Sequence, residues 1–500
     1  MVEDTATSGG VPPRLSRSAL ARLPASVQRP GYALDGTRIG IVHLGPGAFH
    51  RAHVAAYIDD LLAGDPAWGI AAVSLHNPKV RDALLPQDWL YTLAVMGEPL
   101  RLRVIGALRE VLCAPEQPAQ VLARLADPAV RLVTLTVTEK GYALAGGELD
   151  LANREIAHDL AAPESPRSVI GYLTAGLALR RARGVPPCTL LSCDNLADNG
   201  HRLRTAVLQY ARRVDPELAA WIEDRVAFPC SMVDSITPQT DAALRARVAG
   251  ELGCVDAWPV QREPYRQWVI EDRFCNARPA FEAAGAIVTA DVAAFERAKL
   301  RLLNGAHSAL AYLGLLLGLD TVADGMADPV LGGFIERLMR DAIAPVIAMP
   351  AGVDRTGYIG AILARFRNHD VHHQLAQIAW DGSQKLPIRL LGTLDEALKA
   401  GRPMACLVLV VAGWMHFIRR QARAGVAIVD PLADELVAVA ERCDGDPDDD
   451  VRAFLGLERV FGPRRNVPML VGALVTAYAA LADGSPASVA RALGHAGCGG

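Results

Sequence analysis

The sequence lacks the features that mark several large classes of protein. Its nine cysteines are scattered, and none forms a CxxC pair, so we expect neither a disulfide framework nor a metal site. The formal net charge is only −4, and the basic residues are spread along the chain. This distribution argues against nucleic acid or a membrane surface as a partner. Scattered cysteines are typical of a protein of the reducing cytoplasm.

Long apolar runs are also missing. The most apolar stretch, ACLVLVVAGWMHFI at residues 405–418, is shorter than the roughly 20 residues that a bilayer span needs. Residues 1–27 contain no apolar run of signal-peptide length. We therefore expect no membrane segment and a cytoplasmic location.

The apolar residues that are present predict two kinds of domain. In the first half, short β-branched runs alternate with helical patterns, which is typical of a parallel sheet covered on both faces. From about residue 290 onward the patterns are mostly helical. The expected strands are 37–45, 68–75, 130–138, 187–195 and 285–292, with helices at 50–63, 118–126 and 166–183. We predict an N-terminal tail (1–34), a Rossmann-like doubly wound α/β domain (35–289) and a mostly α-helical domain (290–494).

A glycine turn follows the first expected strand. In IVHLGPGAFHRAHVAAY, Gly45 allows a tight turn and Gly47 lets backbone approach a pyrophosphate at the start of a helix. His50 stands where the usual fingerprint has its third glycine, so the motif is truncated and an ordinary turn is the alternative. The expected cofactor-binding residues are Gly45, Gly47, Ala48, Phe49, His50 and Arg51.

The second expected strand lacks the acidic residue that usually binds the ribose hydroxyls of NAD. His76 and Asn77 occupy that place. Lys79 and Arg81 nearby either favour the 2′-phosphate of NADP or are solvated loop charges. The residues alone leave the choice between NAD and NADP open.

The helical stretch FERAKLRLLNGAHSALAYLGLLLG, residues 295–318, carries polar groups in an apolar setting. At about 100° per residue, Glu296, Asn304 and His307 lie within about 140° of Lys299 on one side of the helix. Burying an unpaired ammonium or amide is costly, so these groups either satisfy loop backbone and each other or form a site. Their convergence favours a site, with Lys299 as a desolvated proton carrier.

Three further residues are candidates, each with a structural alternative. Asn195 follows the carboxyl end of an expected parallel strand, where ligands of open α/β sheets bind, although an Asx turn also explains it. Asp234 lies between two proline-bounded turns, and Lys385 follows a glycine turn. A capping role for Asp234 and a solvated position for Lys385 are the alternatives.

The motifs together resemble the long-chain polyol-specific dehydrogenases, the mannitol dehydrogenase family, along nearly the whole chain. Those that carry the resemblance are GPGAFHRAH, TVTEKGY, SCDNLADNG, FPCSMVD, EPYRQWVIED, KLRLLNGAH and DGSQKLP. The resemblance implies metal-free hydride transfer between a nicotinamide and a secondary alcohol carbon of an open-chain sugar derivative. It also implies that Lys299 is the general acid and base, and that Asn195 and Asn304 donate hydrogen bonds to the reacting oxygen.

The same resemblance assigns the remaining positions. It implies that His307 orients the substrate and that Glu296 lies on a proton path to solvent. It further implies that Asp234 and Lys385 contact substrate hydroxyls.

Within the family, the sequence is most similar to the fructuronate reductase branch, in which NAD-dependent enzymes interconvert D-mannonate and D-fructuronate. Gln377 stands where the mannitol branch has Arg. Candidates to hold the uronate carboxylate are Arg365, His372, His373 and Lys385, with an exposed loop as the alternative for the two histidines. A mannitol- or arabinitol-type polyol dehydrogenase and a non-catalytic dinucleotide-binding sensor are the competing functions. The sequence leaves open a monomer or a small homo-oligomer.

Overall fold

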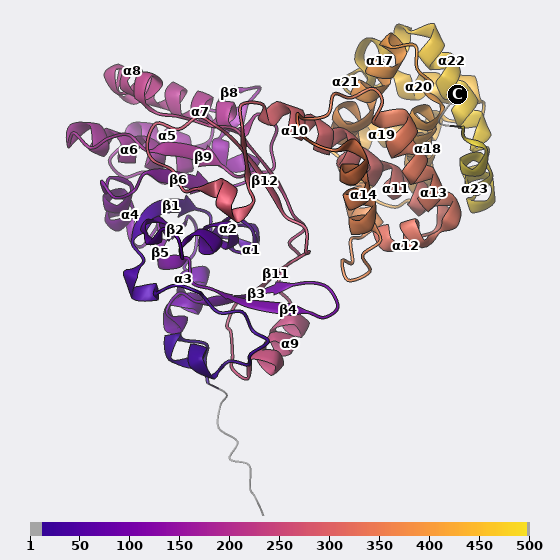
Figure 1. Ribbon diagram of the computed structural model, residues 1–500. Helices are drawn as coiled ribbons and strands as arrows, with labels where there is room; N and C mark the ends of the chain where they lie inside the picture. The colour runs from indigo at the N-terminus through magenta and orange to yellow at the C-terminus, as the bar shows by residue number, and fades with distance from the viewer. Residues whose placement is uncertain (1–12, 498–500) are drawn as a thin grey trace, which may run out of the picture. The chain divides into compact units, whose positions relative to one another are not determined.

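The computed structural model describes residues 13–497. The chain forms two compact units that divide after Val292, and each is described by itself (Figure 1). The first unit contains the β-sheets, and the second is helical.

A five-stranded parallel sheet forms the centre of the first unit. Its strands lie in the order β5-β2-β1-β6-β9, and every neighbouring pair is parallel. This is the order in which the chain of a Rossmann fold starts at the centre and reverses direction beside its first strand. The strands are β1 (Ile39–Leu44), β2 (Gly69–Ser74), β5 (Leu108–Cys113), β6 (Leu132–Leu135) and β9 (Thr189–Ser192). The Rossmann-like doubly wound class expected from the sequence is confirmed.

Both faces of this sheet are covered because successive side chains of β1 point to opposite sides. Ile41 packs with α1 (Ala48–Ala52) and α2 (Val54–Leu61). Val42 and Leu44 pack on the other face. The helices there are α4 (Pro118–Leu125), α6 (Val169–Ala182) and α7 (Asn199–Val214).

Besides the two-stranded sheet of β7 (Leu144–Ala145) and β8 (Glu148–Leu149), two three-stranded sheets accompany the central one. In the first, β10 (Ser231–Asp234) is antiparallel to β12 (Gln267–Glu271), which is parallel to β13 (Ile287–Thr289). The second has the order β11-β3-β4, formed by Val260–Arg262, Tyr91–Val95 and Arg101–Ile105. The strand expected at 285–292 therefore exists as β13, but it belongs to a separate sheet.

The described part of the expected N-terminal tail packs onto the first unit. Leu15, Leu23 and Val27 are buried in a cluster with residues of β3 and β4. Residues 1–12 of the expected tail lie outside the described residues.

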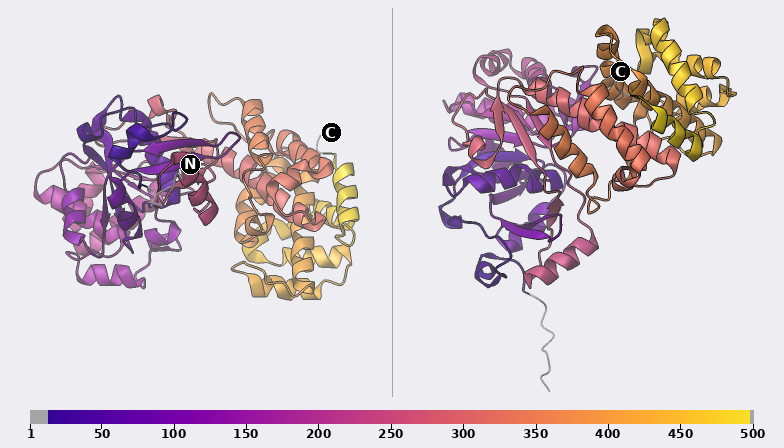
Figure 2. Two further views of the ribbon diagram at one scale, coloured as in Figure 1. Left: turned by 90° about the horizontal axis from the view of Figure 1, so that it is seen from below. Right: turned by 45° about the vertical axis from the view of Figure 1, so that its right-hand side comes forward.

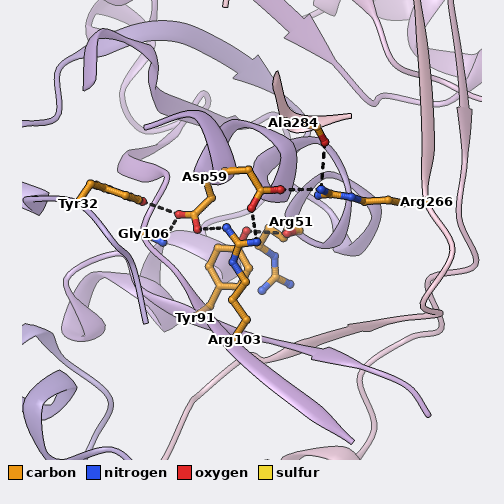
Figure 3. A network of polar contacts seen from close by, with 9 residues as sticks. Tyr32, Arg51, Asp59, Tyr91, Arg103, Gly106, Arg266 and Ala284 are labelled. Atoms are coloured by element: carbon orange, nitrogen blue, oxygen red, sulfur yellow. Dashed lines mark hydrogen bonds and ion pairs between the residues drawn. The ribbon is translucent and has the colours of Figure 1, made fainter. Parts of the chain in front are cut away.

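A network of ion pairs holds α2 in place beside the two smaller sheets (Figure 3). Arg103 of β4 binds Asp59 and Asp60 of α2, each at 2.5 Å. Arg266 binds Asp60 at 2.6 Å, and the Tyr32 hydroxyl donates to Asp59 at 2.5 Å. Because Asp59 is fully buried, losing one cation would leave an uncompensated charge. The network therefore fixes the helix that follows the glycine turn.

The second unit is built of helices around one apolar core (Figure 2). Its central helix, α11 (Asn304–Leu317), packs against α18 (Ala405–Arg423). The continuous helix Val292–Leu317 is long and apolar enough to cross a membrane by length and composition alone. However, 72% of its most apolar 18-residue stretch is buried inside the protein. This burial is typical of the core helix of a globular domain.

Candidate active site

The glycine turn after β1 is built around Gly45. Its φ of +90° lies in the region that side chains rarely adopt, and a Cβ there would lie 2.3 Å from the carbonyl oxygen of Thr136. The Gly45 N–H donates to the Val73 carbonyl of β2 at 3.0 Å. Only glycine fits this position, because of its backbone conformation and the nearby Thr136 carbonyl and not because of a ligand.

Gly47 is glycine for a different reason. It is the N-cap of α1 in extended backbone, and a Cβ there would meet nothing closer than the Gly45 oxygen at 4.0 Å. It lines a cleft of about 610 Å³ at the carboxyl ends of β1, β2 and β6, together with Gly45 and Pro46. The space beside this backbone, at the first N–H groups of a helix, fits a pyrophosphate.

His50 and Arg51 lie inside the unit and support the turn from behind. The Arg51 guanidinium donates to the Trp258 carbonyl at 2.6 Å, and the Tyr91 hydroxyl donates to the Arg51 carbonyl at 2.7 Å. The His50 ring stacks on His43, with ring centroids 3.4 Å apart. Burial lowers the pKa of both histidines. Cofactor contacts by Ala48, Phe49, His50 and Arg51 stay predictions.

His76 and Asn77 line the cleft at the end of β2. Arg81, a candidate for a 2′-phosphate, instead binds Glu116 at 2.6 Å and Asp82 at 2.9 Å.

Sequence analysis missed two charged residues of the cleft, Glu155 and Arg167. Both residues lie in the segment between β6 and α6, and neither belongs to a recognisable sequence motif.

The loop that carries Asn195 is held by its neighbours. The Asp194 carboxylate accepts from the Thr138 N–H at 2.8 Å and from the Tyr142 hydroxyl at 2.9 Å. The Asn199 amide donates to the carbonyls of Asp194 at 3.0 Å and Ser231 at 2.8 Å. The ends of β9 and the start of β10 are therefore joined through Asn199. Sequence analysis read SCDNLADNG as one motif and did not single out this residue.

Asp234 is the last residue of β10 and is buried. It lies opposite Gln267 of β12. The Gln267 carbonyl is 2.9 Å from Nε2 of the buried His53. Burial lowers the pKa of His53 to about 3, so this ring is neutral near Asp234.

Lys299 and Asn304 are brought together by a π-helical turn. The long helix is α-helical over α10 (Val292–Ala298), π-helical from Lys299 to Leu303 and α-helical again in α11. Within the turn, the Asn304 N–H donates to the carbonyls of Leu300 and Lys299, four and five residues back. Asn304 therefore stands above Lys299 as residue i+4 does in an α-helix. The uniform 100° spacing assumed from the sequence was wrong here.

A second π-helical segment, Pro387–Leu391, explains the glycine that follows Asn304. A Cβ on Gly305 would lie 3.2 Å from the Arg389 carbonyl oxygen. The Arg389 guanidinium donates to Ser308 Oγ at 3.1 Å and approaches the Asn304 carbonyl at 3.5 Å. These contacts fix Asn304 and the start of α11.

His307 lies one turn beyond Asn304 and is buried. Its ring is 4.4 Å from Phe366 and 5.2 Å from His373, centroid to centroid. Among the described residues, its Nε2 has no hydrogen-bond partner. Burial holds the pKa of His307 well below its ordinary value, and the positive groups around it add to the effect. The imidazole is therefore neutral, with one nitrogen available to a ligand.

The groups that lower the pKa of His307 are His373, Arg389, Arg365 and Lys299. Lys385 belongs to the same surroundings, since it lowers the pKa of His373. The Lys385 Nζ donates to the Ile378 carbonyl at 3.3 Å. Burial is the largest cause that lowers the pKa of Lys385, and Arg389 is the second. We call Lys299, Arg365, His373, Lys385 and Arg389 the basic cluster.

The remaining sequence candidates in the second unit are less enclosed. His372 and Gln377 are exposed, so the histidine that contacts His307 is His373 and not its neighbour. Glu296 is half-buried on α10, the helix that leads into Lys299. Their proposed substrate and proton-path roles stay predictions.

Two family models match the chain in the order of its units. The mannitol dehydrogenase Rossmann domain matches residues 39–283, and the mannitol dehydrogenase C-terminal domain matches residues 291–482. The chain belongs to the mannitol dehydrogenase family. Members are oxidoreductases that act on CH–OH groups, so the chain is an enzyme of that class.

Individual family members are similar over nearly the whole chain. D-mannonate oxidoreductase of Escherichia coli (strain K12) is 43% identical over 470 residues, which is 91% of this chain and 96% of that protein. A D-sorbitol dehydrogenase structure in substrate-free form superposes with a TM-score of 0.89 at 34% identity, covering 96% and 100% of the two chains. Pseudomonas fluorescens mannitol 2-dehydrogenase, solved with NAD and D-mannitol, gives 0.80 at 38% identity, covering 96% and 99%.

Proposed function

We propose that the protein is an NAD-dependent oxidoreductase that interconverts D-mannonate and D-fructuronate in the cytoplasm, as part of hexuronate breakdown. The observation that carries the proposal is the basic cluster around the neutral ring of His307, whose Nε2 has no hydrogen-bond partner among the described residues. Similarity to a D-mannonate oxidoreductase supports the same substrate class.

The basic cluster bears on the substrate because a uronate carries a carboxylate and a neutral polyol does not. Arg365 and Arg389 act on His307, and Lys385 acts on its neighbour His373, so a carboxylate bound here gains attraction from these cations. Lys385 uses one long hydrogen bond to protein, at 3.3 Å, so most of its donor capacity remains for a ligand. A substrate carboxylate among these groups accepts charge-assisted hydrogen bonds.

We assign the proton transfer to Lys299. In the oxidation direction its neutral amine takes the hydroxyl proton of the alcohol carbon, and in reduction its ammonium returns a proton to the forming alkoxide. The step uses the amine directly and needs no metal-bound water. Lys299 is buried, so its amine is removed from bulk water. When bound, the nicotinamide accepts or donates the hydride.

The other residues position the substrate. Asn304, one hydrogen-bonded turn above Lys299, donates a hydrogen bond to the oxygen on which charge develops. For the first unit we propose the same role for Asn195, and a contact of Asp234 with substrate hydroxyls. His307 binds a neighbouring hydroxyl through Nε2, and Glu296 relays protons between Lys299 and solvent.

The cleft has room for a pyrophosphate beside the backbone of Gly47. Arg81, one candidate for binding a 2′-phosphate, is already paired with Glu116 and Asp82. A related mannitol 2-dehydrogenase was solved with NAD. We therefore propose NAD as the preferred cofactor.

The proton-transfer assignment is tested by Lys299→Ala, with Lys399→Ala as the matched control, because Lys399 is an exposed lysine at the end of α17 (Gly392–Lys399). Loss of acid–base help lowers kcat by about 10²–10⁴-fold. NADH affinity, measured by fluorescence titration, should stay unchanged because the cleft lies in the first unit. A kcat for Lys299→Ala equal to that of Lys399→Ala would refute the assignment.

A further inference from the structure

Three potential metal ligands gather behind the loop that carries Asn195. Asp198 and His201 lie at the N-terminal end of α7, and Cys230 directly precedes β10. The His201 Nδ1 is 2.5 Å from Asp198 Oδ1, and Cys230 Sγ is 3.7 Å from each of these atoms. The described residues thus bring one thiol, one imidazole and one carboxylate to a single point.

The spacing of these atoms suits a tetrahedral ion. With zinc bonds of about 2.3 Å to sulfur and about 2.0–2.2 Å to nitrogen or oxygen, tetrahedral angles place sulfur roughly 3.6 Å from each lighter ligand. The observed 3.7 Å distances match this. To bind the same ion, His201 Nδ1 and Asp198 Oδ1 must move apart by roughly 1 Å, which breaks their present hydrogen bond. Both side chains can do so, since Asp198 is 62% and His201 53% exposed.

The surroundings supply access and a rigid base. Asp198 and His201 line a pocket of about 360 Å³, which has room for water as a fourth ligand. Cys230 is buried, and its N–H donates to Glu271 at 2.8 Å, so the sulfur is held at a fixed point. Arg202 lines the same pocket and is engaged by Glu139 at 3.4 Å.

We propose that Asp198, His201 and Cys230 bind a divalent transition-metal ion of the zinc class, with water completing the coordination. The thiol and the imidazole select against Mg²⁺ and Ca²⁺, which prefer oxygen ligands. On binding, Cys230 loses its thiol proton to solvent and the thiolate bonds to the ion. The ion ties the start of α7 to the start of β10, the two segments that Asn199 already joins.

This site lies outside the proposed hydride-transfer chemistry and does not rest on the proposed substrate. Sequence analysis expected no metal site because it looked for closely spaced cysteines. Here the ligands come from two segments that are distant in sequence, and only the fold unites them.

Cobalt(II) titration of the chelator-treated full-length enzyme tests the proposal. Tetrahedral Co²⁺ bound to a thiolate gives a charge-transfer band in the near ultraviolet and visible d–d bands. We expect one equivalent of Co²⁺ per chain, displaced by Zn²⁺. Cys230→Ser should remove the charge-transfer band, and His201→Gln should lower the affinity by at least about tenfold.

Cys275→Ser is the matched control, because Cys275 is the free cysteine of the described residues that is not buried. It should bind Co²⁺ as the unaltered enzyme does. His201 is exposed, so His201→Gln folds even if Cys230→Ser does not. Absence of the band in the unaltered enzyme, or an unchanged titration in His201→Gln, would overturn the site. The readout is independent of activity, so failure of the proposed function would leave the result interpretable.

Discussion

Replacing Lys385 by methionine separates a carboxylate-binding role from a structural one. Methionine keeps a long apolar stem and removes only the ammonium. In the structure that ammonium donates one hydrogen bond, to the Ile378 carbonyl at 3.3 Å. Burial and then Arg389 lower its pKa, whereas Asp381 and Asp430 raise it. Losing one long, partly exposed hydrogen bond and a repulsion should change the free energy of unfolding by less than about 1 kcal/mol.

The effect on catalysis should be larger and should depend on the substrate. A hydrogen bond to a charged group contributes about 1.5–3 kcal/mol, so kcat/KM for D-fructuronate should fall roughly 10–150-fold. With D-fructose the same ammonium contacts a neutral hydroxyl and gains no attraction to a second charge, so the loss should be several-fold smaller. The assay is NADH oxidation with both substrates, with Lys399→Met as the control. Equal losses on the two substrates, or no loss on D-fructuronate, would refute the carboxylate role of Lys385.

Two further predictions concern the glycine turn and pH. Gly45→Ala should lower the free energy of unfolding by about 1–3 kcal/mol because of its φ of +90° and the Thr136 oxygen. Gly47→Ala should keep the melting temperature and weaken NADH binding. Unfolding caused by Gly47→Ala, with only NADH binding weakened in Gly45→Ala, would contradict these roles. Burial lowers the folded pKa of His43 and His53 to about 3 and of His416 to about 4. The unfolded chain therefore takes up protons first as pH falls below about 6.5, and stability is lost from there down to about pH 3. Urea unfolding at pH 7 and pH 5 measures this, and an unchanged free energy of unfolding would count against neutral buried histidines.

The sequence predicted four of the five strands of the central sheet and missed β5. β1, β2, β6 and β9 are buried on both faces, so their apolar runs are continuous and easy to recognise. β10, β11 and β12 are short and pair with strands far along the chain, and a pattern confined to a few residues carries little information. β13 was recognised as a strand, but its partner β12 was not.

The candidate site shows the same division. The Lys299–Asn304–His307 face was predicted as a group, but its geometry was not. Helical periodicity assumes a constant turn, and the π-turn that aligns Lys299 with Asn304 depends on packing against the segment around Arg389. The choice of His373 over His372 beside His307 is likewise decided by how one loop packs.

The central claim is that this enzyme acts on a uronate. The most direct test is the rate of NADH oxidation by the unaltered protein with D-fructuronate, D-tagaturonate and D-fructose in parallel. The account predicts the highest kcat/KM with D-fructuronate. A higher kcat/KM with D-fructose would contradict it and favour a polyol dehydrogenase of the mannitol type.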